Sequence, residues 1–176
     1  MKLVRWKRFT WDLHNLPSPA PRLDERYIVR PAFADDQRAV TTILLSTFKL
    51  DNAWSDTAST VSDWLGPQIA LAFEREAAPA LVITHGQRII AACAISTDID
   101  AETHLLSGPC VSMEYRNRGL GTALLYHTLL QLRQAGLAQA HGVSKDNVPA
   151  AKFVYPKFDS IGVDYDFEPA LAKAPL

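Results

Sequence analysis

The most constraining feature of this sequence is a short turn, containing glycine and arginine, between an apolar strand-like segment and a long apolar helix. Residues 111–115 are typical of a strand end, and residues 119–134 predict a helix that Gly136 ends. The first turn of such a helix presents several unpaired backbone N–H groups. The helix dipole adds roughly half a positive charge at that end. The chain therefore pairs a strand with a helix whose N-terminus is open to an anion.

The residue types in this turn favour a phosphate group as the anion. Gly119 and Gly121 have no side chains, so phosphate oxygens can approach the backbone closely. Arg116 and Arg118 add full positive charges beside the glycines. Together these residues predict a cradle for a pyrophosphate.

Two well-known phosphate motifs compete for this segment. A P-loop requires Lys-Ser/Thr after its last glycine, but Gly121 is followed by Thr122 and Ala123. A dinucleotide-binding fingerprint requires a third glycine, and Leu124 stands in its place. Asp146 follows the next expected strand, where a ribose-binding acid would lie, but too little chain remains for that fold. A dinucleotide-binding protein is therefore the weaker alternative.

The rest of the chain predicts strands and helices in alternation. A helix is expected after Asp35 or Asp36, with its apolar face at residues 40–48, and a second over about 55–65, ended by Gly66-Pro67. Residues 68–77 are expected to add another helical turn or two. Two apolar runs on either side of residues 85–86 predict a β-hairpin. The other expected elements are strands at 27–30, 104–111, 139–144 and 161–167 (one or two strands) and a helix at 147–155. The order βα(α)ββ-β-αβαβ indicates an α+β domain with a mixed sheet.

Residues 1–26 differ in composition from the rest of the chain. Basic and aromatic residues are interleaved in the first half, and Pro17, Pro19 and Pro21 favour a stiff extended connector. The favoured interpretation is an extra strand or arm packed on the domain or on a partner subunit; anion or nucleic-acid binding is the alternative. We expect an arm and connector at 1–26 and a single domain at 27–176, with a homodimer left open.

Composition limits the partners of this chain of 176 residues. Its 18 basic and 19 acidic residues give a net charge of −1, whereas proteins that neutralise nucleic-acid backbones carry a basic excess. No apolar run approaches the roughly 20 residues that span a bilayer, and no apolar stretch follows the basic N-terminus as in a signal peptide. Cys93 and Cys110 lack metal-ligand spacing. We therefore expect no nucleic-acid, membrane or metal partner, and a cytoplasmic location.

Residues 116–121, Arg-Asn-Arg-Gly-Leu-Gly, resemble the motif Arg/Gln-x-x-Gly-x-Gly/Ala of the GNAT superfamily of acyl-CoA-dependent N-acetyltransferases. Residues 147–155 are similar to the Asn-x-x-Ala…Phe/Tyr segment that follows the family's fifth strand. The resemblance covers residues 27–167, of which only 111–155 are motif-specific. It implies a three-layer α/β/α domain with a central, mostly antiparallel sheet that is splayed between its fourth and fifth strands. It also implies acetyl-CoA as the cosubstrate.

The resemblance assigns cofactor-binding roles along this segment. The pyrophosphate would lie on the backbone of residues 116–122, and the pantetheine arm between the splayed strands. The implied cofactor-binding residues are Cys110, Val111, Met113, Arg116, Asn117, Arg118, Gly119, Leu120, Gly121, Thr122 and Asn147. Asn147 alternatively caps its own helix. Two departures from the family pattern, Pro109 and Phe158-Asp159, affect the pantetheine contacts and the register of the last helix.

The resemblance also implies direct attack by a primary amine on the thioester in a ternary complex. This reaction needs a base for the amine and a proton for the departing thiolate. Tyr155 occupies the family's tyrosine position and is expected to supply that proton, with core packing as the alternative. Glu102 and His104 are the candidate bases, on one face of the expected strand by alternation. A non-catalytic acyl-CoA-binding module is the alternative to an enzyme.

The acceptor site would lie at the first two helices and the loop between them, residues 49–63. Charge and ring faces there favour a cationic amine, whereas solvated aspartates and core tryptophans are the structural alternative. The residues concerned are Asp51, Asp56, Asp63, Trp54 and Trp64.

Overall fold

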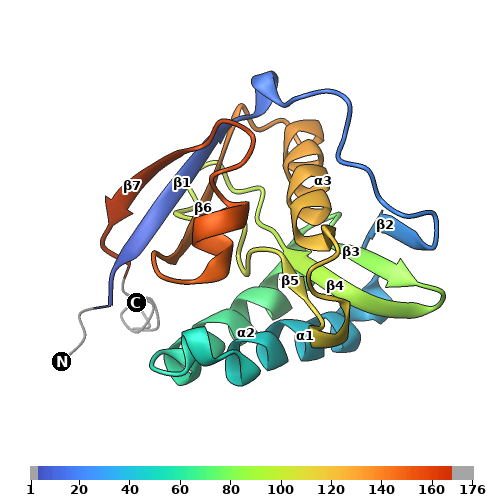
Figure 1. The fold of residues 1–176 in the computed structure, drawn as a ribbon, viewed down its shortest axis with the longest axis horizontal. Helices are drawn as coiled ribbons and strands as arrows, with labels where there is room; N and C mark the ends of the chain where they lie inside the picture. Colours follow the sequence, from blue (N-terminus) through green and yellow to red (C-terminus); the bar gives the residue numbers. More distant parts are fainter. Residues whose placement is uncertain (1–3, 168–176) are drawn as a thin grey trace.

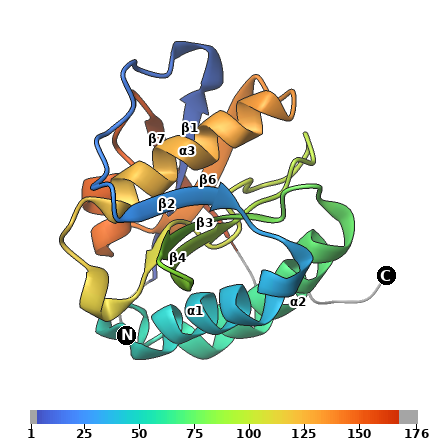
Figure 2. The same ribbon diagram turned by 90° about the vertical axis from the view of Figure 1, so that its right-hand side faces the viewer.

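The computed structural model describes residues 4–167, which form three layers. Helices α1 (Gln37–Leu50) and α2 (Ala58–Arg75) cover one face of a sheet, and α3 (Leu120–Gln134) covers the other, as Figure 2 shows. The strands are β1 (Trp6–Asp12), β2 (Tyr27–Pro31), β3 (Ala80–His85), β4 (Arg88–Ala94), β5 (Cys110–Val111), β6 (Gln139–Lys145) and β7 (Ile161–Tyr165). The predicted α+β class with helices on both faces of the sheet is confirmed.

The strands form two sheets rather than one continuous sheet. One has the order β2-β3-β4-β5 and the other β6-β1-β7, and every strand pair is antiparallel. β5 and β6 do not pair, but the sheets are joined at one end, where the N–H groups of His104 and Leu105 donate to the carbonyl of His141 at 2.7 and 3.2 Å. The two halves therefore diverge from this join, which confirms the predicted splay.

The N-terminal basic and aromatic stretch contributes the middle strand of the second sheet. β1 lies between β6 and β7, as Figure 1 shows. Alternation along β1 buries Phe9 and Trp11 and turns Arg8 and Thr10 to the other face. Phe9, Trp11 and Leu13 belong to the same hydrophobic core as α1 and α3. The expected extra strand thus packs inside this chain's own sheet, and the composition boundary at residue 26 does not coincide with an edge of the core.

The second helix does not end at Gly66-Pro67 as predicted. It continues through Pro67 to Arg75, so the helical turns expected at 68–77 belong to the same helix. An interior proline costs about 3 kcal/mol. Leu65 and Ile69 are fully buried on either side of it, and each such burial contributes about 1.5–3 kcal/mol. Packing of this face therefore outweighs the proline.

The segment expected as a strand at 104–111 is mostly a loop. Only β5 and an isolated bridge between Leu105 and Ile95 have strand pairing. Gly108 has a φ of 64°, and Pro109 has no N–H to donate to a ladder. Both residues turn the backbone out of the sheet immediately before β5.

The segment expected as a helix at 147–155 is a single π-helical turn. It spans Ala150–Val154, and the N–H of Tyr155 donates to the carbonyl of Ala150 at 2.8 Å. Farther along, one strand rather than two occupies residues 161–167. The hairpin of β3 and β4, α1, α3 and β6 lie where the sequence predicts them.

Candidate functional site

A cleft of about 340 Å³ lies where the two sheets diverge. We call it the central cleft. Its walls come from β5, the start of α3, β6, the π-helical turn and the segment linking α1 to α2. It brings together nine of the residues that the resemblance implicates: Cys110, Val111, Arg116, Asn117, Gly119, Leu120, Gly121, Thr122 and Tyr155.

One end of the cleft is the turn that leads into α3. Asn117 and Gly119 both have left-handed backbone conformations, with φ values of 63° and 77°. Alternating left- and right-handed residues curl backbone N–H groups around a concave anion site. The N–H groups of Leu120, Gly121 and Thr122 have no acceptor among the described residues, and no side chain caps the helix. This end of the cleft is therefore built to receive an anion.

The glycine within this helix start leaves room for the anion. A Cβ placed on Gly121 would have the Cγ2 atom of Val111 as its nearest neighbour, at 4.0 Å. The protein packing therefore does not require glycine here, and a left-handed φ does not require it either. Glycine at this position leaves the helix backbone open to close approach by a ligand.

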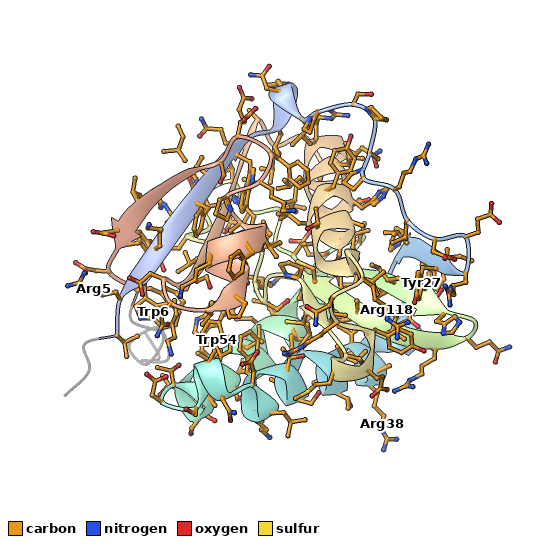
Figure 3. All side chains as sticks on the ribbon, viewed as in Figure 1. Arg5, Trp6, Tyr27, Arg38, Trp54 and Arg118 are labelled. Carbon is orange, nitrogen blue, oxygen red and sulfur yellow. The ribbon has the colours of Figure 1, made fainter. Side chains whose placement is uncertain are left out.

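The two arginines of the turn lie in different places. Arg116 lines the cleft, with its Nε 3.4 Å from the Val111 carbonyl and a terminal nitrogen 3.4 Å from the Asp51 carboxylate. Arg118 points away from the cleft and donates to the Tyr27 hydroxyl at 2.9 Å; Figure 3 labels this pair. It also donates to the carbonyl of Glu114 at 3.1 Å. Arg116 thus offers charge to a ligand, and Arg118 braces the turn.

The middle of the cleft is formed by the free edge of β5 and by Tyr155. The backbone of Cys110 and Val111 pairs with β4 on one side only. The Cys110 thiol is buried, which raises its pKa to about 12. A thiol that stays protonated near neutral pH is a poor nucleophile.

Tyr155 is held by packing of its ring against two other aromatic rings. The ring stacks on Phe9 with centroids 5.3 Å apart, contacts Trp11 at 5.6 Å, and is only 2% exposed. Its hydroxyl lies against the backbone of Gly108, where an added Cβ would overlap it. No described residue hydrogen-bonds this hydroxyl, which reaches the cleft. Burial raises the phenol pKa well above its usual value, so the group stays protonated at neutral pH.

The other end of the cleft is aromatic. Five rings line it and touch in sequence, and we call them the aromatic wall: Trp64, Phe167, Trp6, Trp54 and Phe48. Successive ring centroids lie 4.8–6.1 Å apart. Figure 3 shows Trp6 and Trp54 next to each other, between the start of β1 and the start of α2, away from Arg118. The wall therefore lies apart from the anion-binding end.

A buried lysine supports the aromatic wall. The Lys145 side chain, at the end of β6, is 2% exposed. Its Nζ donates to the Ala53 carbonyl at 2.8 Å and to the Asp56 carboxylate at 2.5 Å, and it lies 5.5 Å from the centre of the Trp54 ring. The bond to Lys145 lowers the pKa of Asp56. This lysine ties the segment between α1 and α2 to the second sheet.

The two candidate bases do not line the cleft. Glu102 is exposed and lies beside Tyr165, whose pKa burial and this carboxylate raise. His104 is buried: its Nε2 bonds the Asp98 carbonyl and its Nδ1 accepts from the His141 N–H, each at 2.9 Å. Both ring nitrogens are therefore occupied, and burial lowers the pKa of His104. The alternation expected for a strand fails here because this segment is a loop.

Of four further side chains that the sequence placed at the site, only one, Asp51, lines the cleft. Met113 is 59% exposed and Asn147 is exposed, and neither lines the cleft. Asn147 also does not cap the π-helical turn, whose N-cap position is Pro149. Asp51 lines the cleft, but Asp63 does not.

Six residues that line the cleft were not predicted as site residues: Trp6, Phe48, Ser107, Ser144, Phe153 and Phe167. The alternation of Trp6, Arg8 and Thr10 with the buried Phe9 and Trp11 is the signal for a strand with two packed faces. That signal does not give the strand's partners, so Trp6 could not be placed from sequence.

Comparison of the sequence with models of known protein families identifies the family of this chain. The model of the Acetyltransferase (GNAT) family matches residues 10–157, so the chain belongs to this family. No curated protein matches the sequence.

Several solved structures share the fold. A GCN5-related N-acetyltransferase from Sphaerobacter thermophilus is similar at 17% identity and a TM-score of 0.59, over 93% of this chain and 50% of its own. Another, from Kribbella flavida, has 14% identity and a TM-score of 0.56, over 91% and 56%. The glucosamine N-acetyltransferase region of a fungal multi-domain β-N-acetylglucosaminidase has 14% identity and a TM-score of 0.56, over 94% and 20%. The chain spans about half the length of the first two.

Residues 4–167 have neither a cluster of metal-binding side chains nor a membrane-spanning helix. No three His, Cys, Asp or Glu side chains in this part of the chain are placed to hold a metal ion together. No helix in it has the length and apolar character needed to cross a membrane.

Proposed function

We propose that this protein is an acetyl-CoA-dependent N-acetyltransferase that acetylates a primary amine. The observation that carries the proposal is the start of α3, where three backbone N–H groups without acceptors open onto the central cleft. Membership of the family supports acyl transfer from coenzyme A. The proposal keeps the cytoplasmic location, the absence of nucleic-acid and membrane partners and a homodimer as predictions.

The anion-binding end of the cleft suits the pyrophosphate of coenzyme A. The N–H groups of residues 119–122 would donate to its oxygens, and Arg116 would contribute charge. Val111 and Cys110 present an unpaired strand edge to which the amides of a pantetheine arm can bond. Cofactor binding on this proposal uses mainly backbone groups.

The proposed reaction is direct transfer in a ternary complex. The amine nitrogen attacks the thioester carbonyl, the N–C bond forms, and the C–S bond breaks with its electron pair going to sulfur. Tyr155 donates its phenolic proton to that sulfur, and the proton lost by the amine returns to the phenolate through solvent. A raised pKa keeps the phenol protonated but makes it a weaker acid, so its contribution should be moderate. Neither Glu102 nor His104 is assigned as the base, since neither reaches the cleft.

Calorimetry and a thiol-release assay test this proposal together. We expect acetyl-CoA and coenzyme A to bind and NAD not to bind, and we expect primary amines to release free thiol from acetyl-CoA. Binding of NAD in place of coenzyme A would contradict the assignment. Binding of coenzyme A without thiol release across a broad amine panel would favour the non-catalytic binding module instead.

A further inference from the structure

The acceptor must enter the cleft from the end that phosphates do not occupy. The N–H groups of the α3 start open at one end, and the aromatic wall forms the other. On the proposed function, on which this inference rests, the thioester lies between these ends, beside Tyr155. The side chains of the aromatic wall therefore face the acceptor rather than the nucleotide.

The charges along the cleft exclude one broad class of acceptor. Among the described residues that line it, only Asp51 and Arg116 are charged, and they face each other at 3.4 Å. Asp56 and Lys145 form an ion pair, so their charges balance each other and neither is available to an acceptor. A polyamine or an amino sugar with several ammonium groups needs several free carboxylates, and this cleft does not offer them.

The aromatic rings favour an acceptor with a flat apolar group. Trp6, Trp64 and Phe167 are only partly buried, so their surfaces are open to a ligand. Paired rings attract each other beyond the burial of their area. Three of the five rings come from tryptophan, which offers the largest flat surface of any side chain.

We infer that the acceptor is a primary amine carried on an aromatic group by a short chain, with its ring against the aromatic wall. The ring displaces water from Trp64 and Trp6, and the short chain carries the nitrogen toward the thioester. The specificity-determining residues are therefore Trp6, Trp64 and Phe167, none of which belongs to the segment that binds the cofactor.

Steady-state kinetics with acetyl-CoA and two amines test this inference. We expect kcat/KM for 2-phenylethylamine to exceed that for spermidine by about 100-fold, because burying a ring contributes roughly 2–3 kcal/mol. Trp64→Ala should raise the KM for 2-phenylethylamine about tenfold and leave the KM for acetyl-CoA unchanged, while Trp64→Phe should recover most of the loss. The matched control is Phe33→Ala, which removes an exposed ring outside the cleft. A preference for spermidine, or equal changes in both KM values, would overturn the inference.

A binding measurement separates this inference from the proposed function. Calorimetric titration of 2-phenylethylamine into the protein saturated with coenzyme A measures its binding without requiring turnover. Binding that weakens in Trp64→Ala but not in Phe33→Ala supports the inference. No binding in the unmodified protein overturns it, while calorimetric binding of acetyl-CoA independently preserves the proposed cofactor.

Discussion

The two ends of the central cleft differ in the groups that they offer to a ligand: backbone N–H groups at one end and aromatic side chains at the other. The phosphate end consists of seven consecutive residues, 116–122, and acts mainly through backbone N–H groups. The aromatic end consists of side chains from five separate places: the start of β1, the end of α1, the link between α1 and α2, α2 itself and the residues after β7. A backbone site suits the part that all acyl-CoA molecules share. A side-chain site can change with the acceptor while the strands remain as they are.

The two ends also differ in how their charges are balanced. At the phosphate end, Arg116 faces Asp51 at 3.4 Å, but Arg118 bonds only neutral groups and the open helix N-terminus has no acidic residue in its first turn. At the aromatic end, the buried Lys145 is matched by Asp56. One end therefore has positive potential for a ligand and the other is close to neutral. Each prediction below changes one end, the site between them or the join of the two halves.

The largest effect is expected at the phosphate end. Gly121→Val places a branched side chain where phosphate oxygens would meet the backbone. Coenzyme A affinity measured by calorimetry should fall about 10- to 100-fold, since each hydrogen bond to a charged group is worth roughly 1.5–3 kcal/mol. The KM for the amine should change much less.

The control for this variant is Ala70→Val, which introduces the same side chain at an exposed position of α2. Ala70 does not line the cleft. Both variants should keep the far-ultraviolet circular dichroism of the unmodified protein. Unchanged coenzyme A affinity in a folded Gly121→Val protein would place the phosphates elsewhere.

The next largest effect is expected between the two ends. Tyr155→Phe removes a hydroxyl and keeps the ring stacked on Phe9. We expect kcat to fall about tenfold or more, with little change in coenzyme A affinity, because a positioned acid typically contributes 10²–10⁴-fold and a thiolate leaves more readily than most groups. Since burial raises the pKa of this phenol, its ionisation should not appear as a loss of kcat up to about pH 10.

Two results would decide against an acid role for this hydroxyl. Full kcat in Tyr155→Phe across the pH range would show that Tyr155 serves only to pack the core. A parallel loss of coenzyme A affinity would mean that Tyr155 shapes the cofactor site instead.

The difference between the ends explains what the sequence could predict. The phosphate end depends on local properties, namely glycine placement, a helix start and nearby arginines, so it could be predicted from the sequence without tertiary information. The different orientations of Arg116 and Arg118 could not be predicted, because they depend on Asp51 and Tyr27, which lie far away in the chain. Of the aromatic end, only Trp54 and Trp64 were predicted, because they lie close together in the sequence.

The fold shows the same limit. Elements with strong periodicity, such as α1, α3 and the β3–β4 hairpin, were predicted at nearly their observed positions. The position of β1 between β6 and β7 depends on pairing between opposite ends of the described chain, such as Trp6 with Lys145 and with Tyr165, which no local pattern encodes. The continuation of α2 through Pro67 depends likewise on a tertiary contact, the burial of Ile69.

A smaller effect is expected from the support of the aromatic end. Lys145→Met keeps most of the buried stem and removes the Nζ that holds the Ala53 carbonyl and Asp56. The KM for the amine should rise about three- to tenfold, part of the value of a hydrogen bond to a charged group, because Trp54 is no longer fixed. The KM for acetyl-CoA should not change. Lys145→Arg should restore part of the loss.

The control is Arg26→Met, which breaks an exposed ion pair with Asp24 outside the cleft. Exposed pairs contribute little, so this variant should match the unmodified protein in both KM values. Equal increases in both KM values in Lys145→Met would show that the lysine supports the whole fold rather than the aromatic end.

The smallest effect concerns the join from which the two halves diverge. Burial lowers the pKa of His104 below its usual value, and burial has the same effect on His141, whose ring stacks on it at 5.3 Å. Below about pH 6.5 an unfolded chain binds protons at these histidines that the folded chain does not yet bind. The free energy of unfolding should therefore fall as the pH is lowered from 7.5 to 5.5, by up to about 1.4 kcal/mol per pH unit for each proton.

Urea unfolding at these two pH values measures the effect, with His104→Gln as the test variant. Glutamine can still donate to the Asp98 carbonyl but has no titrating ring, so the variant should lose stability at both pH values and show a weaker pH dependence. The carboxylates with lowered pKa values, Asp36 and Asp56, titrate well below this range and should not obscure the comparison. An unchanged pH dependence of the free energy of unfolding in His104→Gln would assign the effect to other groups. Protonation of His104 would then not affect the stability of the contact between the two sheets.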